Sequence, residues 1–265
     1  MVAGACRSVT GRRSPEIISA VRRTTARAVL TMVTAAALTT GCGTVLDQVA
    51  VATGGGPVVA APASASGDAA SALATLPVKG RAPKTGYDRD QFGSAWADVD
   101  RNGCDTRNDI LKRDLEGETF KPGTHDCVVL TGTLNDPYTG KTIAFKRGQG
   151  TSEAVQIDHV IALSDAWQKG AQQLSPEARR NLGNDPLNLM AVDGRTNQSK
   201  GDGDAATWLP PSRSYRCTYV ARQVAVKAKY RLWVTQAEHD AMQGILAGCQ
   251  GQPLPADSTL SAPKA

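Results

Sequence analysis

The sequence predicts an α+β fold, on three observations. Short apolar runs with β-branched residues, typical of β-strands, are interspersed with segments that carry helix start signals. A stretch with turn chemistry, Asp136-Pro-Tyr-Thr-Gly140, separates two of the strand-like runs and predicts a β-hairpin. Four cysteines in the same part of the chain favour two disulfides.

The first predicted elements are two helices and three strands. Phe92 and Trp96 lie four residues apart and indicate a short helix, and Ile110 with Leu111 marks the buried side of a second one. In chain order, we expect helices over 88–98 and 105–115 and strands over 127–133, 141–145 and 154–161.

The remaining predicted elements are mainly helical. Ser164 is expected to cap a helix that contains Trp167, Pro176 suits a first helical turn, and Thr235 begins a capping box. We expect helices from Ser164 and from Ser175, a strand over 187–192, a helical or looped element over 195–200, and helices over 216–233 and 235–248. The basic run Arg222, Lys227, Lys229 and Arg231 is interpreted as a solvated helix face.

The amino terminus has the pattern of an export signal. An Arg-rich stretch precedes about eleven apolar residues, a length typical of a signal-peptide core and too short to span a bilayer. Thr39-Thr-Gly-Cys42 follows and is similar to a bacterial lipobox, in which Cys42 would be lipidated. Residues 1–42 are therefore predicted to be a signal peptide, and the protein to be exported, either as a cell-surface lipoprotein or secreted. The alternative is a plain signal peptide that is cleaved a little further on.

Composition sets the predicted domain limits. Residues 43–85 are dominated by Ala, Gly, Pro, Ser and Val and lack periodicity, which predicts a disordered tether. We expect one folded domain over 86–250 and a disordered tail over 251–265.

Cysteine spacing predicts how the domain is cross-linked. Cys104, Cys127, Cys217 and Cys249 permit three disulfide pairings. We favour Cys104–Cys127 and Cys217–Cys249, because each pair closes a modest local loop. A zinc site is the weaker alternative, since no two of these cysteines have the short spacing of a zinc knuckle.

Net charge gives no support for nucleic-acid binding. The chain has a formal charge of +5, but residues 1–41 contain six basic residues and one acidic residue. Without them, basic and acidic residues are equal in number. A nucleic-acid partner must therefore be argued from a local site.

Three short segments carry residues suited to phosphodiester hydrolysis: Ile157-Asp-His-Val160, Asn184-Asp-Pro-Leu-Asn-Leu189 and Arg195-Thr-Asn-Gln-Ser-Lys200. Such hydrolysis needs a base that activates water and a cation that stabilises the pentacoordinate phosphate. A histidine at the end of a strand suits the first task. Carboxylate and amide oxygens suit a hard metal ion such as Mg²⁺.

These segments resemble the HNH (ββα-metal) nuclease motif, in the version with Asp-His first and Asn last that also occurs in RNA-guided CRISPR nucleases. Residues from about Tyr87 to Cys249 are also similar to a group of secreted bacterial HNH-family proteins. The resemblance implies a ββα-metal core with flanking helices and the β-hairpin.

The resemblance also implies a role for each motif residue. His159 would be the general base, and Asn188 would hold the first strand and steer the imidazole. Asp158 and Asn197 would bind one divalent metal ion, with Mg²⁺ favoured and Mn²⁺ or another divalent ion as alternatives. Lys200 would approach a phosphate.

The sequence therefore favours a monomeric, exported, metal-dependent endonuclease, with DNA preferred over RNA as substrate. Membrane contact is expected only through a lipid on Cys42. The alternative is a catalytically inactive nucleic-acid-binding or scaffold lipoprotein that keeps the fold. A serine esterase is disfavoured because the chain has no G-x-S-x-G elbow.

Overall fold

The computed structural model describes residues 68–255. The predicted signal peptide, its Cys42 and most of the predicted tether and tail lie outside these residues. The helices are α1 (Ala69–Leu73), α2 (Thr106–Asp114), α3 (Leu163–Gln168), α4 (Pro176–Asn184), α5 (Gly194–Lys200), α6 (Arg216–Lys229) and α7 (Gln236–Leu246). The strands are β1 (Leu115–Phe120), β2 (Val129–Asn135), β3 (Thr142–Lys146), β4 (Val155–His159) and β5 (Leu189–Asp193).

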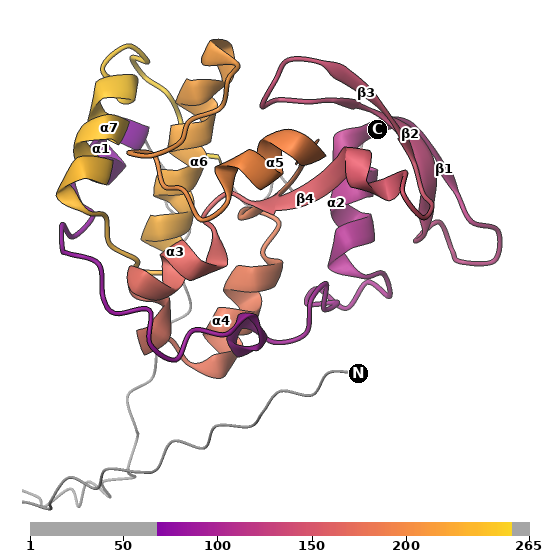
Figure 1. Ribbon diagram of the computed structural model, residues 1–265, viewed down its shortest axis with the longest axis horizontal. Coiled ribbons are helices and arrows are strands. Elements are labelled where there is room, and N and C mark those ends of the chain that lie inside the picture. Colours follow the sequence, from indigo (N-terminus) through magenta and orange to yellow (C-terminus); the bar gives the residue numbers. More distant parts are fainter. Residues whose placement is uncertain (1–67, 256–265) are drawn as a thin grey trace, which may run out of the picture. The chain divides into compact units, whose positions relative to one another are not determined.

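The predicted α+β class is confirmed, with two small antiparallel sheets. Strands β1, β2 and β3 form a meander in that order, and β4 pairs with β5. The expected hairpin is β2–β3, in which Leu134 pairs with Ile143. Helix α5 follows β5 directly, so β4, β5 and α5 form a strand–strand–helix unit (Figure 1).

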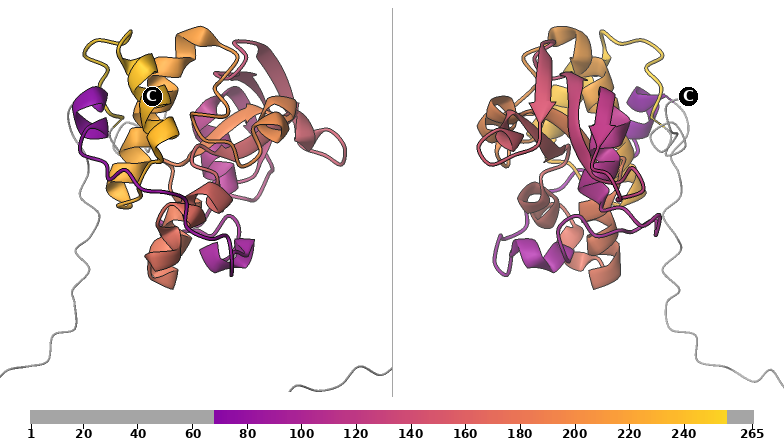
Figure 2. Two further views of the ribbon diagram at one scale, coloured as in Figure 1. Left: turned by 60° about the vertical axis from the view of Figure 1, so that its left-hand side comes forward. Right: turned by 90° about the vertical axis from the view of Figure 1, so that its right-hand side faces the viewer.

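One face of the β4–β5 ribbon packs against α2 and the β1–β3 sheet, and the other packs against helices. One apolar cluster joins its Ile157, Leu189 and Ala191 to Ile110 and Leu111 of α2. The other joins Met190 and Val192 of β5 to α6 and α7, on the face of the ribbon that also contacts α5. Figure 2 shows the fold from two further directions. The ribbon is therefore covered on both faces. The environment of each β4 side chain depends on the face to which it points.

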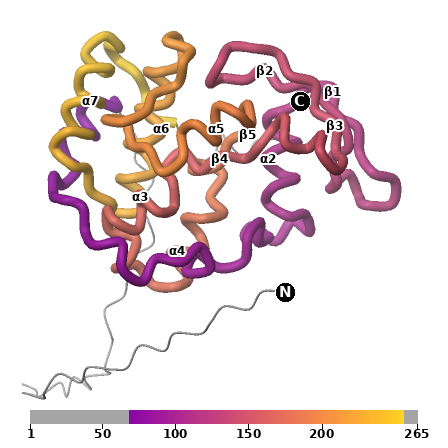
Figure 3. Tube along the Cα trace, viewed as in Figure 1, coloured from indigo at the N-terminus to yellow at the C-terminus, as the bar shows by residue number. Residues whose placement is uncertain are grey.

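The amino-terminal part of the fold corrects the predicted domain boundary. Residues 69–85, predicted as tether, include α1, whose Ala69 and Leu73 are buried beside α6 and α7. The chain then pairs Val78 with Val234 and runs past α3 and α4 (Figure 3). At the other end, Ala69 N–H donates to the carbonyl of Gln252, so the fold also passes residue 250.

Local differences from the predicted elements have local causes. The predicted helix over 88–98 is only a 3₁₀ helix, Arg89–Phe92, which ends at Gly93 with a φ of 75°. Strand β1 was not predicted. Ser164 lies inside α3, whose N-cap is Ala162, and Asp193 caps α5. The helix start at Ser175 with Pro176 in the first turn and the capping box at Thr235 are confirmed.

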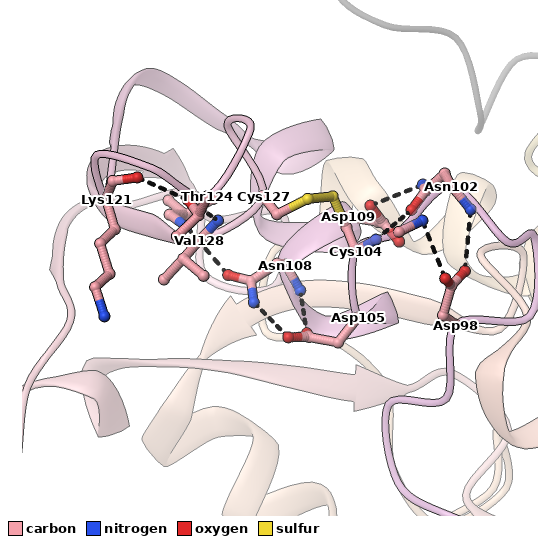
Figure 4. Close-up of a disulfide and its surroundings, with 12 residues drawn as sticks. Asp98, Asn102, Cys104, Asp105, Asn108, Asp109, Lys121, Thr124, Cys127 and Val128 are labelled. Atoms are coloured by element: carbon pink, nitrogen blue, oxygen red, sulfur yellow. Dashed lines mark hydrogen bonds between the residues drawn. A yellow bond between two sulfur atoms is a disulfide. The ribbon is translucent and has the colours of Figure 1, made fainter.

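Both predicted disulfides are confirmed. Cys104 bonds to Cys127 and Cys217 to Cys249, with Cα–Cα distances of 5.2 and 5.9 Å. The first ties the residue before the α2 N-cap to the start of β2 (Figure 4). Beside it, Asp105 caps α2 and holds the Asn108 amide, whose oxygen accepts from the N–H of Val129. No helix within residues 68–255 is both long and apolar enough to cross a bilayer.

Candidate active site

The two motif residues at the end of β4 belong to opposite faces of the ribbon. Side chains alternate along a strand, and cross-strand partners share a face. Asp158 pairs with Met190, which belongs to the α6 side, and His159 pairs with Leu189, which belongs to the α2 side. The structure therefore separates the expected base from the expected metal ligand, although they are neighbours in sequence.

The His159 imidazole is held in one tautomer. Its Nε2 lies 2.8 Å from the carbonyl oxygen of Gly183, at the end of α4. A carbonyl oxygen can only accept, so Nε2 carries the proton and the lone pair is on Nδ1. Among residues 68–255, Nδ1 has no hydrogen-bond partner. Burial lowers the pKa of His159 to about 4, so the ring is neutral at pH 7.

A small cavity adjoins this imidazole. It has a volume of 80 Å³, which is room for several water molecules. His159 and Gly183 form one side, and the segment Arg89–Trp96 forms much of the rest. Trp96 stacks on the imidazole, with ring centroids 6.3 Å apart and an interplanar angle of 18°. Water can therefore reach the surroundings of a base that is itself largely desolvated.

Asn188 fixes the chain around the base. Its side chain is fully buried, and its oxygen accepts from the N–H of Ile161 at 2.8 Å. Its amide nitrogen donates to the carbonyls of Ile161 and Leu182, at 3.3 and 3.2 Å. Leu182 precedes the residue whose carbonyl holds the imidazole. Asn188 thus joins the turn after His159 to the end of α4, an arrangement suited to a positioning residue.

Asp158 is fully engaged on the other face. Its Oδ2 accepts from the Tyr138 hydroxyl at 2.5 Å, and its Oδ1 accepts from Lys200 Nζ at 2.9 Å. Lys200 also donates to the carbonyl of His159 at 2.7 Å, and its side chain is 0% exposed. Lys200, the expected phosphate ligand, therefore forms a buried ion pair with Asp158, and its ammonium group is not exposed to solvent.

Asn197 is hydrogen-bonded to Gln156, on the face of β4 that also carries Asp158. Its Nδ2 donates to Gln156 Oε1 at 3.0 Å. Within residues 68–255, no group of three or more His, Cys, Asp and Glu side chains could hold a metal ion. Because Lys200 provides the positive charge at Asp158, the residues as they lie do not fit the expected metal ion.

Two aromatic residues of the site were missed in the sequence. Tyr138 is fully buried among Trp208, Tyr215 and Tyr219 and brings the tip of the β2–β3 hairpin to Asp158. The sequence showed it only as part of a turn. Trp96 was assigned to a predicted helix, and no sequence signal places it over a histidine 63 positions later.

Comparisons with known proteins find a matching family and a similar protein. Residues 105–245 match the family of GmrSD restriction endonucleases, C-terminal domain. A protein of Arthroderma benhamiae named "Uncharacterized secreted protein" is 36% identical over 208 residues, which cover 77% of this chain and 97% of that protein. No solved structure matches the chain significantly.

Proposed function

Because the chain belongs to the family of GmrSD restriction endonucleases, C-terminal domain, we propose that it is an endonuclease that hydrolyses phosphodiester bonds. The substrate is nucleic acid, with DNA preferred over RNA, and the enzyme acts as a monomer. The observation that carries the proposal is the bond from His159 Nε2 to the Gly183 carbonyl, which leaves Nδ1 as the free base.

His159 acts as the general base in this proposal. A water molecule in the 80 Å³ cavity would lose its proton to Nδ1 as it attacks phosphorus. The Gly183 carbonyl keeps the ring oriented and supports the charge that develops on it. The neutral form of the ring, which alone accepts a proton, predominates at pH 7 because of burial. Asn188 acts through the chain that it holds and not on the substrate.

The role of a metal ion is a separate question. The resemblance to HNH nucleases predicts one divalent ion, favoured as Mg²⁺, at Asp158 and Asn197. The contacts of Lys200 and Tyr138 with Asp158 oppose that prediction. A nuclease assay with a panel of divalent metal ions tests the prediction directly.

We further propose that the protein is exported. The Arg-rich stretch and apolar core of residues 1–42 supply the signal, and the two disulfides suit an oxidising compartment. The relative that matches over most of the chain is named as secreted. Lipidation of Cys42 would make the protein a surface lipoprotein, and mass spectrometry of the exported chain decides between the two forms.

One observation favours a second function, that of a catalytically inactive nucleic-acid-binding protein that keeps the fold. The carboxylate expected to bind metal is closed by an ammonium group and a phenol. An enzyme that needs Asp158 as a ligand would have to open these contacts. A binding protein would not.

The test is a nuclease assay on the exported chain, residues 43–265. Supercoiled plasmid and single-stranded RNA are incubated with Mg²⁺, Mn²⁺ or Zn²⁺, or with chelator. We expect nicking and linearisation of the plasmid in at least one condition. If the protein binds both substrates but cleaves neither under any condition, the second function is supported and the first is contradicted.

A further inference from the structure

We propose that Arg89 binds a phosphate group of the substrate at the cavity that holds His159. This inference rests on the proposed function and names the substrate contact that the site otherwise lacks. The chemical class recognised is a phosphodiester oxyanion, which a guanidinium group can bind through two parallel N–H···O bonds.

Arg89 and the imidazole line the same 80 Å³ cavity. Arg89 is exposed and begins the 3₁₀ helix Arg89–Phe92, which forms one wall. The two side chains also interact electrically, since the positive charge of Arg89 contributes to the low pKa of His159, after burial itself. A phosphate held by Arg89 would therefore lie beside the nitrogen that activates water.

Arg89 has no protein partner that competes for its charge. Within residues 68–255, its side chain makes no hydrogen bond and no ion pair. It is also the one cationic side chain among the described residues that line this cavity. Two carboxylates lie nearby: Asp90 lines the same cavity, and Asp88 caps the 3₁₀ helix through the N–H of Asp90. Neither forms an ion pair with Arg89.

The motif does not supply a substitute for this cation. Lys200, expected from the motif to approach phosphate, is buried against Asp158 on the other face of β4. Among the described residues, no cation other than Arg89 lines the cavity to balance the negative charge of a pentacoordinate phosphate beside His159. Arg89 provides this positive charge. It lies outside residues 105–245, the part of the chain that matches the family, so the family motif does not include it.

The wall that carries Arg89 is fixed to the domain. Phe92 is 2% exposed and packs in the main core. Arg179 of α4 donates to the Gln91 carbonyl at 2.9 Å, and Asn184 accepts from the N–H of Ala97 at 2.9 Å. The position of Arg89 beside the cavity is therefore set by packing and not by a free loop, as expected for a preorganised contact.

The test measures binding without turnover. The exported chain, its Arg89→Ala and Arg89→Lys variants, and Arg213→Ala are titrated onto a short fluorescein-labelled DNA duplex in chelator, at several NaCl concentrations. Arg213 is a matched control, because it is exposed, begins a 3₁₀ helix and has no side-chain hydrogen bond or ion pair among the described residues. Melting temperatures confirm that all variants are folded.

We expect Arg89→Ala to weaken binding about tenfold and to reduce the slope of log K against log [NaCl] by about 0.9, the value of one phosphate contact. Arg89→Lys should keep the slope, and Arg213→Ala should match the wild type. Wild-type affinity and slope in Arg89→Ala, or no DNA binding by any of the proteins, would overturn the proposal.

The result is distinguishable from failure of the proposed function. If the wild type cuts no substrate but binds DNA with an Arg89-dependent slope, the nuclease proposal fails and this one stands. If the wild type cuts DNA and Arg89→Ala binds and cuts equally well, only the Arg89 proposal fails.

Discussion

At the scale of single residues, burial determines the chemistry of His159. An exposed imidazole would be partly protonated near neutral pH, whereas this one is 8% exposed and neutral. The sequence could indicate this residue because His159 follows a strand-like run and precedes two suitably spaced asparagines. It could not indicate the tautomer, since the acceptor is a backbone carbonyl 24 positions later that only the fold brings close.

The low pKa of His159 predicts an acid-sensitive fold. Between pH 6.5 and about 4 the unfolded chain binds a proton that the folded protein does not, so the free energy of unfolding falls as pH falls through this window. The loss from this group should approach about 3 kcal/mol. Urea denaturation at a series of pH values should show a flatter dependence for His159→Gln than for His239→Gln. Equal slopes for both variants would contradict the assignment.

At the scale of elements, the order of the strand–strand–helix unit was predictable and its side-chain partners were not. Sequence patterns indicated β4, β5 and α6, and the capping box at Thr235 indicated the start of α7. However, the interpretation of the basic run as a solvated face was wrong for Arg222 and Lys227, whereas Arg231 is exposed. Arg222 is buried and donates to the carbonyls of Leu187 and Leu189, and Lys227 is buried against Glu238 of α7. Periodicity cannot reveal carbonyls and carboxylates that come from other elements.

The ion pair between Lys200 of α5 and Asp158 of β4 predicts the effect of removing its cation. In Lys200→Met, Asp158 would lose its buried counter-charge, which should lower the free energy of unfolding by about 3–5 kcal/mol. Because the carboxylate then lacks a cation, we expect Mn²⁺ to raise the melting temperature of this variant and to leave that of the wild type nearly unchanged. Lys141→Met, at an exposed lysine, is the control. An identical Mn²⁺ response in wild type and Lys200→Met would contradict the assigned role of Lys200.

At the scale of the whole described domain, a set of charges that is buried except for Arg81 joins segments that are far apart in sequence. Arg81 contacts Asp165 and Asp204 at 2.8 and 2.6 Å, and Lys169 contacts Asp204 and Glu238 at 2.7 and 2.6 Å. Residues 69–85 therefore contribute a cation as well as apolar side chains to the domain. Their Ala-, Gly- and Pro-rich composition concealed this role, because a few buried side chains do not create periodicity.

The corrected boundary predicts the effect of truncation. A chain that begins at Gly86 would lose the buried side chains of Leu73 and Leu76 and the charge of Arg81. Two leucine side chains contribute about 4 kcal/mol, which corresponds to a fall of about 10 °C in melting temperature for a domain of this size. Calorimetry of chains 43–265 and 86–265 measures the difference. Equal melting temperatures for the two chains would support the domain predicted from the sequence, which begins at residue 86.

The proposed hydrolysis depends most on His159 as a base that removes a proton from water. Single-turnover cleavage of plasmid by His159→Ala, with and without added imidazole, tests it most directly, and His239→Ala serves as the control histidine. We predict that His159→Ala cuts at least about 100-fold more slowly than the wild type, that imidazole restores part of the rate, and that His239→Ala is unaffected. A folded His159→Ala protein that cuts at the wild-type rate would contradict the account.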